Sequence, residues 1–218
     1  MFADDDKVVR PRVKICGITT PADAAAAIEF GADALGFNFF AGSRRYLPVG
    51  ESRDWIAELP SGIVKVAVLV NPAWTEAVEV AGFPGITALQ LHGMETPDFC
   101  RGLAKQGIRF AKAIPVTNEF AVDNLPSFFT RTIVLDSARG GQFGGSGRPF
   151  PWEIARKFVE DHPRLRVILA GGLTPENVAD AVAMVRPFGV DVTSGVESSA
   201  RVKDYDRLRA FIAAARAS

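Results

Sequence analysis

The strongest candidates for catalytic groups in this chain are one thiol and one carboxyl group, each at the end of an apolar run. Cys16 ends RVKIC and Asp136 ends TIVLD. A thiolate can remove a proton and a carboxylic acid can donate one, so the pair would suit an isomerisation that moves protons within a substrate. A lone cysteine is more often a small buried residue, and an aspartate more often caps a helix. However, a 14-residue glycine-rich loop follows Asp136, so no helix begins within its reach.

Two lysines lie in runs of the same kind, Lys14 beside Cys16 and Lys112 in IRFAKAI. Side chains alternate along a strand, so Lys14 is expected on the same side as Cys16, where its ammonium would favour the thiolate. Lysines at such positions can also form Schiff bases with carbonyl substrates. An aldolase therefore remains open as an alternative.

Glycine turns after two of the later apolar runs suggest an anion site. Gly171-Gly172 follows LRVILA, and Ser194-Gly195 follows VDVTS. Bare backbone N–H groups in such turns can approach a phosphate, although each turn could also be purely structural. A third glycine-rich stretch, residues 144–147, is suited to cover a ligand as a lid.

Arginines and histidines add fewer constraints. Of the neighbours Arg44 and Arg45, one is expected to be solvated, while the other could bind a carboxylate through two parallel hydrogen bonds. His92 could serve as an acid or base, or equally as a structural hydrogen-bonding residue. The only other histidine, His162, is expected on the surface at a helix end. With so few ligand residues, no metal site is expected.

Eight short apolar runs are expected to be strands buried on both faces. Between them lie helical patterns, and four of these begin with a polar residue followed by proline: Thr20-Pro21, Asn71-Pro72, Thr96-Pro97 and Thr174-Pro175. Two helices should end at Gly31 and Gly107. The eight predicted strands cover residues 12–16, 32–40, 63–70, 86–92, 108–114, 132–136, 165–170 and 190–194.

Strict alternation of strands and helices indicates parallel strands, and eight such units fit a single (β/α)8 TIM barrel. An open doubly wound sheet is the competitor, but Cys16-Gly17-Ile18-Thr19 after the first strand is not its glycine fingerprint. Barrels place function at the carboxyl ends of the strands, where Cys16 and Asp136 would face each other. Closure brings the last strand beside the first, so we expect an ion pair between Lys14 and Asp191.

Composition limits the class of protein. The 218 residues carry 25 basic and 25 acidic side chains, and this balance argues against a nucleic-acid or membrane-surface partner. No apolar run is long enough to span a bilayer, the first residues do not resemble a secretory signal, and two cysteines suggest no disulfide framework. We expect a cytoplasmic protein with a short, flexible N-terminal extension over residues 1–10 and one barrel domain over residues 11–218.

Several motifs occur in an order that closely resembles the phosphoribosylanthranilate isomerase family. They are VKICGIT, GADALGF, SRRYLP, LQLHG, IVLD, FGGSGRPFPW, AGGLTPENV and VDVTSGVE, and they extend over nearly the whole chain from residue 12. The resemblance implies conversion of N-(5-phosphoribosyl)anthranilate to 1-(2-carboxyphenylamino)-1-deoxyribulose 5-phosphate, an Amadori rearrangement in tryptophan biosynthesis. It implies a small phosphorylated substrate and neither a cofactor nor a metal. We expect a monomer or a homodimer, with the monomer slightly favoured.

The resemblance also implies roles for individual residues. Asp136 would be the general acid that opens the sugar ring, and Cys16 the general base that removes the C2 proton. Arg45 would hold the anthranilate carboxylate. The implied phosphate site consists of Gly171, Gly172, Ser194 and Gly195, together with Gly145, Ser146 and Gly147.

Three alternatives remain at this stage. A related isomerase of the histidine pathway performs the same type of reaction, but it typically carries an aspartate at the position of Cys16. An aldolase would use a lysine nucleophile at a strand end. A non-catalytic protein that binds a phosphorylated ligand would not need Cys16 or Asp136 at all.

Overall fold

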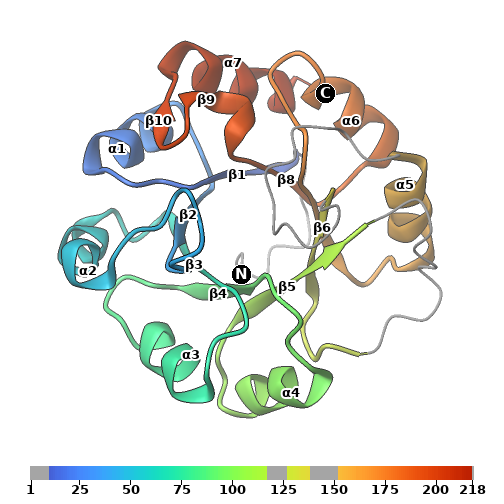
Figure 1. Cartoon of the computed structure of the whole chain (residues 1–218). Helices are drawn as coiled ribbons and strands as arrows, with labels where there is room; N and C mark the ends of the chain where they lie inside the picture. Colours follow the sequence, from blue (N-terminus) through green and yellow to red (C-terminus); the bar gives the residue numbers. More distant parts are fainter. Residues whose placement is uncertain (1–9, 117–126, 138–151, 218) are drawn as a thin grey trace.

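The strands form one closed barrel in which every strand is parallel to its neighbours (Figure 1). The computed structural model describes residues 10–116, 127–137 and 152–217. The barrel order follows the chain order from β1 to β8, so both the predicted fold and all eight predicted strands are confirmed. The strands are β1 Arg12–Cys16, β2 Ala34–Asn38, β3 Val64–Leu69, β4 Ala88–Leu91, β5 Phe110–Pro115, β6 Thr132–Asp136, β7 Arg166–Leu169 and β8 Gly189–Val192.

Helices surround the barrel as an outer ring (Figure 1). Between β5 and β6 the described residues contain no helix, and residues 117–126 lie outside the described part of the chain. Residues 1–9 of the expected N-terminal extension also lie outside it. The helices are α1 Pro21–Glu29, α2 Val49–Glu58, α3 Trp74–Ala81, α4 Pro97–Lys105, α5 Trp152–Asp161, α6 Val178–Val185 and α7 Tyr205–Arg216.

Two of the four predicted helix starts are confirmed. The hydroxyl groups of Thr20 and Thr96 each accept a hydrogen bond from a backbone N–H in the first turn, at 3.1 and 3.2 Å. The predicted ends are also correct, since Gly31 and Gly107 follow α1 and α4 with positive φ angles. A left-handed residue at this position is easiest for glycine, and it turns the chain back toward the next strand.

The other two starts are wrong by two to three residues. α3 begins at Trp74 because the Asn71 side chain is used elsewhere: its oxygen accepts from Met94 N at 2.6 Å and so ties the end of β3 to the loop after β4. Thr174 begins a separate turn, in which its carbonyl accepts from Asn177 N, and α6 starts only at Val178. Proline after a polar residue suits a turn as well as a first helical turn.

The inside of the barrel is packed mostly with small side chains. The larger apolar residues lie on the opposite face of the strands and pack against the helices. This division leaves space inside for polar side chains near the carboxyl ends of the strands. The interior cluster consists of Ala34, Val66, Ala88, Ala111, Ala113, Val134, Ile168 and Ala170.

β1 and β8 close the barrel, and Lys14 pairs in register with Asp191. The predicted ion pair is confirmed, because Lys14 Nζ lies 2.9 Å from Asp191 Oδ2 and both side chains are buried. After β8 comes the short 3₁₀ helix η2, Ser194–Val196. A small antiparallel hairpin of β9, Glu197–Ser199, and β10, Val202–Lys203, then lies between α1 and α7 (Figure 1).

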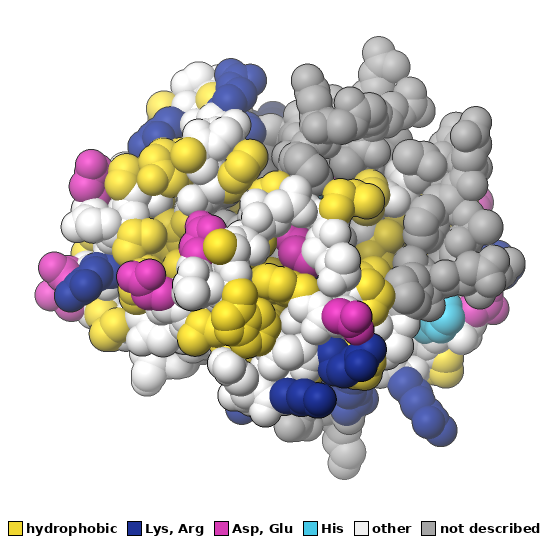
Figure 2. All heavy atoms as spheres, turned by 60° about the horizontal axis from the view of Figure 1, so that its bottom comes forward, with side chains coloured by type: hydrophobic (Ala, Val, Ile, Leu, Met, Phe, Trp, Pro, Cys, Tyr) yellow, Lys and Arg dark blue, Asp and Glu magenta, His cyan; other side chains and the backbone are white. Residues whose placement is uncertain are grey.

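The outer surface carries mixed charges. On the face shown in Figure 2, basic and acidic side chains are interspersed with apolar ones rather than collected into one basic field. This arrangement agrees with the equal numbers of acidic and basic residues. No helix among residues 10–116, 127–137 and 152–217 has the length and apolar character needed to cross a bilayer.

Candidate active site

A cavity of about 670 Å³, here called the mouth cavity, opens at the carboxyl ends of the strands. It brings together the predicted acid, base, arginine and glycine turns, which are widely separated in the sequence. Asn38 and Gln90 extend its polar lining. The predicted residues that line it are Cys16, Arg45, Asp136, Gly171, Gly172, Ser194 and Gly195, together with Arg44 and His92.

Cys16 lies on the inner face of the barrel, directly above Lys14. Gly36 on the neighbouring strand makes room for both, since a Cβ there would lie 2.7 Å from Cys16 Sγ and 3.0 Å from Lys14 Nζ. Burial alone lowers the pKa of Lys14, but its interactions with Asp191 and Cys16 outweigh burial and raise that pKa above its ordinary value of 10.5. Lys14 is therefore an ammonium next to the thiol of Cys16.

Asp136 is buried at the end of β6 and contacts His92 rather than a helix. Its Oδ2 lies 3.0 Å from His92 Nε2, and His92 Nδ1 lies 2.9 Å from Gln90 Nε2. The Gln90 amide nitrogen can only donate, so in this arrangement the imidazole proton is on Nε2 and is donated to Asp136. Gln90 Oε1 is buried without a partner among the described residues.

Gly171 lets the end of β7 approach Asp136 closely. Its φ is +85°, and a Cβ there would lie 2.1 Å from Ser137 Oγ and 2.6 Å from Asp136 Oδ1. No side chain fits at this point without moving the carboxyl group of Asp136. The sequence predicted Gly171 only as a phosphate contact, whereas the structure also gives it the role of clearing space for Asp136.

The other glycine turns also line the mouth cavity. Gly172 also has a positive φ, of +68°, and its carbonyl accepts from Asn177 Nδ2 at 3.0 Å. Gly195 packs on the preceding loop, since a Cβ there would lie 2.0 Å from the Leu173 carbonyl oxygen. The turns after β7 and β8 are therefore held against each other. The predicted contacts Gly145, Ser146 and Gly147 lie outside the described residues.

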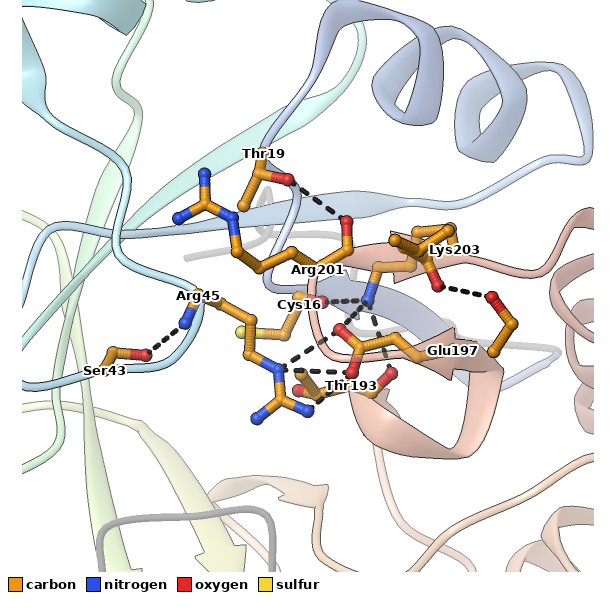
Figure 3. Close-up of polar contacts among 10 residues, drawn as sticks. Cys16, Thr19, Ser43, Arg45, Thr193, Glu197, Arg201 and Lys203 are labelled. Carbon is orange, nitrogen blue, oxygen red and sulfur yellow. Dashed lines mark hydrogen bonds and ion pairs between the residues drawn. The ribbon is translucent and has the colours of Figure 1, made fainter.

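Arg45, in the loop after β2, forms an ion pair with Glu197, whose side chain is 3% exposed (Figure 3). Arg44 is exposed, as expected for one member of the pair. The stem of Arg45 crosses Gly17, where a Cβ would lie 3.2 Å from Arg45 Cγ. The structure thus selects Arg45 as the arginine with a fixed position at the mouth cavity.

Comparisons with known proteins agree on one family. The sequence pattern of "N-(5'phosphoribosyl)anthranilate (PRA) isomerase" matches residues 13–214. The chain belongs to the phosphoribosylanthranilate isomerase family. The N-(5'-phosphoribosyl)anthranilate isomerase of Trichlorobacter lovleyi is 43% identical over 202 residues, covering 92% of this chain and 96% of that protein.

Solved structures of phosphoribosylanthranilate isomerases share the fold over nearly the whole chain. The enzyme from Thermotoga maritima is 39% identical, with a TM-score of 0.82 over 94% of this chain and 98% of that one. A complex with reduced 1-(o-carboxyphenylamino)-1-deoxyribulose 5-phosphate is 38% identical, with a TM-score of 0.79 and the same coverage. The isomerase class and the barrel expected from the sequence are thereby confirmed.

In this member of the phosphoribosylanthranilate isomerase family, Lys112 is not among the residues that line the mouth cavity. It lies between Ala111 and Ala113, which face the interior, so its side chain points toward the helices. Its ammonium contacts Glu95 Oε2 at 2.9 Å and the Gly93 carbonyl at 2.7 Å. Since Lys14 is bound to Asp191, neither lysine favours the aldolase alternative.

Among the described residues, no cluster of His, Cys, Asp and Glu could hold a metal ion.

Sequence reasoning missed two residues that contact the lining of the mouth cavity. Glu197 and Lys203 come from β9 and β10, and Lys203 donates to the Cys16 carbonyl at 2.7 Å (Figure 3). Burial lowers the pKa of Lys203, and Glu197 opposes this effect by attraction. The only sequence signal was an acidic residue shortly after the Ser194-Gly195 turn, which does not reveal its partner.

Proposed function

We propose that this chain converts N-(5-phosphoribosyl)anthranilate to 1-(2-carboxyphenylamino)-1-deoxyribulose 5-phosphate, with Asp136 as general acid and Cys16 as general base. The observation that carries the proposal is that one cavity holds a buried Cys16 above Lys14 and a buried Asp136 bound to His92. Relatives with this activity over more than nine-tenths of the chain support the choice of substrate.

The proposed reaction needs two proton movements. Asp136 donates its proton to the ring oxygen of the ribose, the C1–O bond breaks, and the anthranilate nitrogen and C1 form a Schiff base. Cys16 as thiolate then takes the proton from C2, which gives an enolamine. Protonation at C1 and loss of the enol proton give the ketone, so no external oxidant or reductant is needed. The Lys14 ammonium supports the thiolate, and the contact with His92 orients Asp136 and can resupply its proton.

The substrate has two anionic groups, and the lining of the mouth cavity offers a binding group for each. The phosphate would receive N–H groups from the turns at Gly171, Gly172, Ser194 and Gly195, with residues 145–147 as the remaining part of the proposed site. The carboxylate would bind Arg45. This orientation sets the ribose between Cys16 and Asp136. A monomer remains our prediction, although the enzyme of Thermotoga maritima is described as dimeric.

The test is turnover of phosphoribosylanthranilate, followed by the loss of its fluorescence. We expect Cys16→Ser and Asp136→Asn each to lower kcat by at least about 100-fold, while the reduced product analogue still binds. Cys100→Ser is the matched control. Wild-type turnover in either catalytic variant would refute the assigned roles, and no turnover by the unaltered protein would refute the substrate.

The carboxylate contact can be tested separately with the neighbouring arginines. Arg45→Ala should raise KM more than Arg44→Ala, since Arg45 is fixed by Glu197 while Arg44 is exposed. Equal effects of the two substitutions would reject Arg45 as the carboxylate ligand.

A further inference from the structure

One edge of the Arg45 guanidinium is occupied by Glu197. Arg45 Nε lies 3.2 Å from both carboxylate oxygens, and Nη2 lies 2.5 Å from Oε2 (Figure 3). These two nitrogens form the side edge of the planar group. The terminal edge, formed by Nη1 and the second N–H of Nη2, makes no hydrogen bond to the described residues. A guanidinium can therefore hold Glu197 and a second carboxylate at the same time.

Glu197 is itself held by a second cation. Lys203 Nζ lies 3.2 Å from Glu197 Oε1, and the Lys203 side chain is fully buried. The same ammonium donates to the carbonyls of Cys16 and Thr193, at 2.7 and 3.3 Å. Lys203 thus ties Glu197 to the ends of β1 and β8.

The hairpin that carries these residues is fastened to the loops around the mouth cavity. Arg201 Nη1 donates to the Tyr46 carbonyl at 2.8 Å, and the Arg201 carbonyl accepts from Thr19 Oγ1 at 3.4 Å (Figure 3). Tyr46 belongs to the loop after β2, and Thr19 to the loop after β1. In the loop after β2, the Arg45 backbone N–H also donates to Ser43 Oγ, at 3.1 Å. Both ends of the Arg45–Glu197 contact are therefore anchored to the barrel.

The charge of this group suits one more anion. Arg45 and Lys203 are positive and Glu197 is negative, so the three side chains together carry one excess positive charge. In a partly buried site a ligand carboxylate would balance that charge. Without Glu197, the long arginine side chain would be free to adopt several rotamers, and binding would have to restrict them.

We propose that Glu197 is a positioning residue that turns the terminal edge of Arg45 toward the substrate carboxylate, and that Lys203 holds Glu197 in place. This inference rests on the proposed function, because it takes the ligand to be an aryl carboxylate. Glu197 bonds only to the side edge of Arg45, so a substrate carboxylate can bind the terminal edge without displacing Glu197. The competing role is that Glu197 blocks Arg45 and must be displaced before the substrate binds.

The test uses Glu197→Gln and two ligands, the reduced product and the same compound without its carboxylate. Glutamine keeps the shape but removes the charge. We expect the variant to bind the carboxylate compound about 10-fold more weakly or worse, and the compound without the carboxylate within about two-fold of the unaltered protein. KM should rise by a similar factor, with a smaller change in kcat. Asp33→Asn is the matched control, since Asp33 pairs with Arg12 at 3.1 Å at the other end of the barrel.

A mutant cycle with Arg45→Met shows whether Glu197 acts through Arg45. In the Arg45→Met background, Glu197→Gln should cause no further selective loss. If glutamine at 197 destabilises the barrel, Glu197→Asp gives the same measurement, since it withdraws the carboxylate by one methylene. Equal weakening of both ligands, no weakening, or tighter binding of the carboxylate compound would each overturn the inference. Turnover by the unaltered protein, measured in parallel, tests the proposed function separately.

Discussion

Lys14 and Asp191 occupy matching register positions on the first and last strands of the barrel, and their charged atoms lie 2.9 Å apart. Both side chains are buried, one layer below Cys16. Removing one member of such a pair leaves a buried charge without a partner, which typically costs about 3–5 kcal/mol. The pair therefore contributes to the closure of the barrel and to the charge next to the thiol.

Lys14→Met should lower the free energy of unfolding by about 3–5 kcal/mol in urea denaturation, because Asp191 is left unpaired. Lys14→Met combined with Asp191→Leu should recover most of this loss, since no buried charge remains. Both the single and the double variant should have a lower kcat than the unaltered protein, because the ammonium beside Cys16 is absent from both. A double variant with unaltered kcat would show that Lys14 has only a structural role.

The same pair predicts a stability change at high pH. The pKa of Lys14 is raised above its ordinary value of 10.5, so the folded state holds this proton more tightly than the unfolded state. The contribution is complete below pH 10.5 and is lost as the pH rises through the raised value. The stability difference between the unaltered protein and the double variant should thus stay constant from pH 8 to about pH 10, then change in favour of the variant. A constant difference up to pH 12 would contradict the raised pKa.

His92→Asn should lower kcat by about 10- to 100-fold with little change in KM, because Asp136 loses the hydrogen bond that orients it. His162→Asn, at the end of α5, is the control and should behave as the unaltered protein. An unchanged kcat for His92→Asn would mean that the contact with Asp136 has no part in turnover.

Iodoacetamide should modify Cys16 and leave Cys100 unmodified at neutral pH, as measured by peptide mass spectrometry. Burial raises the pKa of Cys100 to about 11, and its side chain is fully buried. Cys16 lines the mouth cavity and lies beside an ammonium. Modification should abolish activity, the reduced product analogue should prevent it, and Cys100→Ser should be inactivated at the same rate as the unaltered protein. Faster labelling of Cys100 than of Cys16 would contradict this assignment.

Gly171→Ala should lower both stability and kcat. Its Cβ would collide with Ser137 and Asp136, and its φ of +85° is strained for alanine, at a typical cost of about 1–3 kcal/mol. Gly107→Ala is a control with a similar φ of +71° and no atom within 4 Å. It should show the backbone cost alone and retain full kcat. If both variants keep full kcat, the close approach of Gly171 to Asp136 does not matter for catalysis.

Strand periodicity made much of the site predictable. Alternation along β1 correctly placed Lys14 beneath Cys16, and barrel closure correctly paired it with Asp191. Such inferences succeed because parallel strands in a closed barrel have a fixed order, so chain position determines which strands are neighbours.

Contacts made by loops were not predictable in this way. The hydrogen bond between His92 and Asp136 joins the ends of β4 and β6, which are not neighbours in the barrel. Glu197 reaches Arg45 only because the hairpin after β8 folds back over β1. The start of α3 was misplaced for a related reason, since Asn71 binds the next loop instead of capping the helix.

The contact between Lys203 and the Cys16 carbonyl joins positions 187 residues apart in the chain. During synthesis, Cys16 leaves the ribosome early. Its surroundings are complete only after the hairpin of β9 and β10 has been synthesised and has folded. The proposed carboxylate end of the cavity is therefore among the last parts to assemble, and it depends on contacts of very long sequence separation. Nascent chains that stop before residue 197 would lack Glu197 and Lys203 even if their strands had begun to associate, so ligand binding would report completed synthesis rather than early folding.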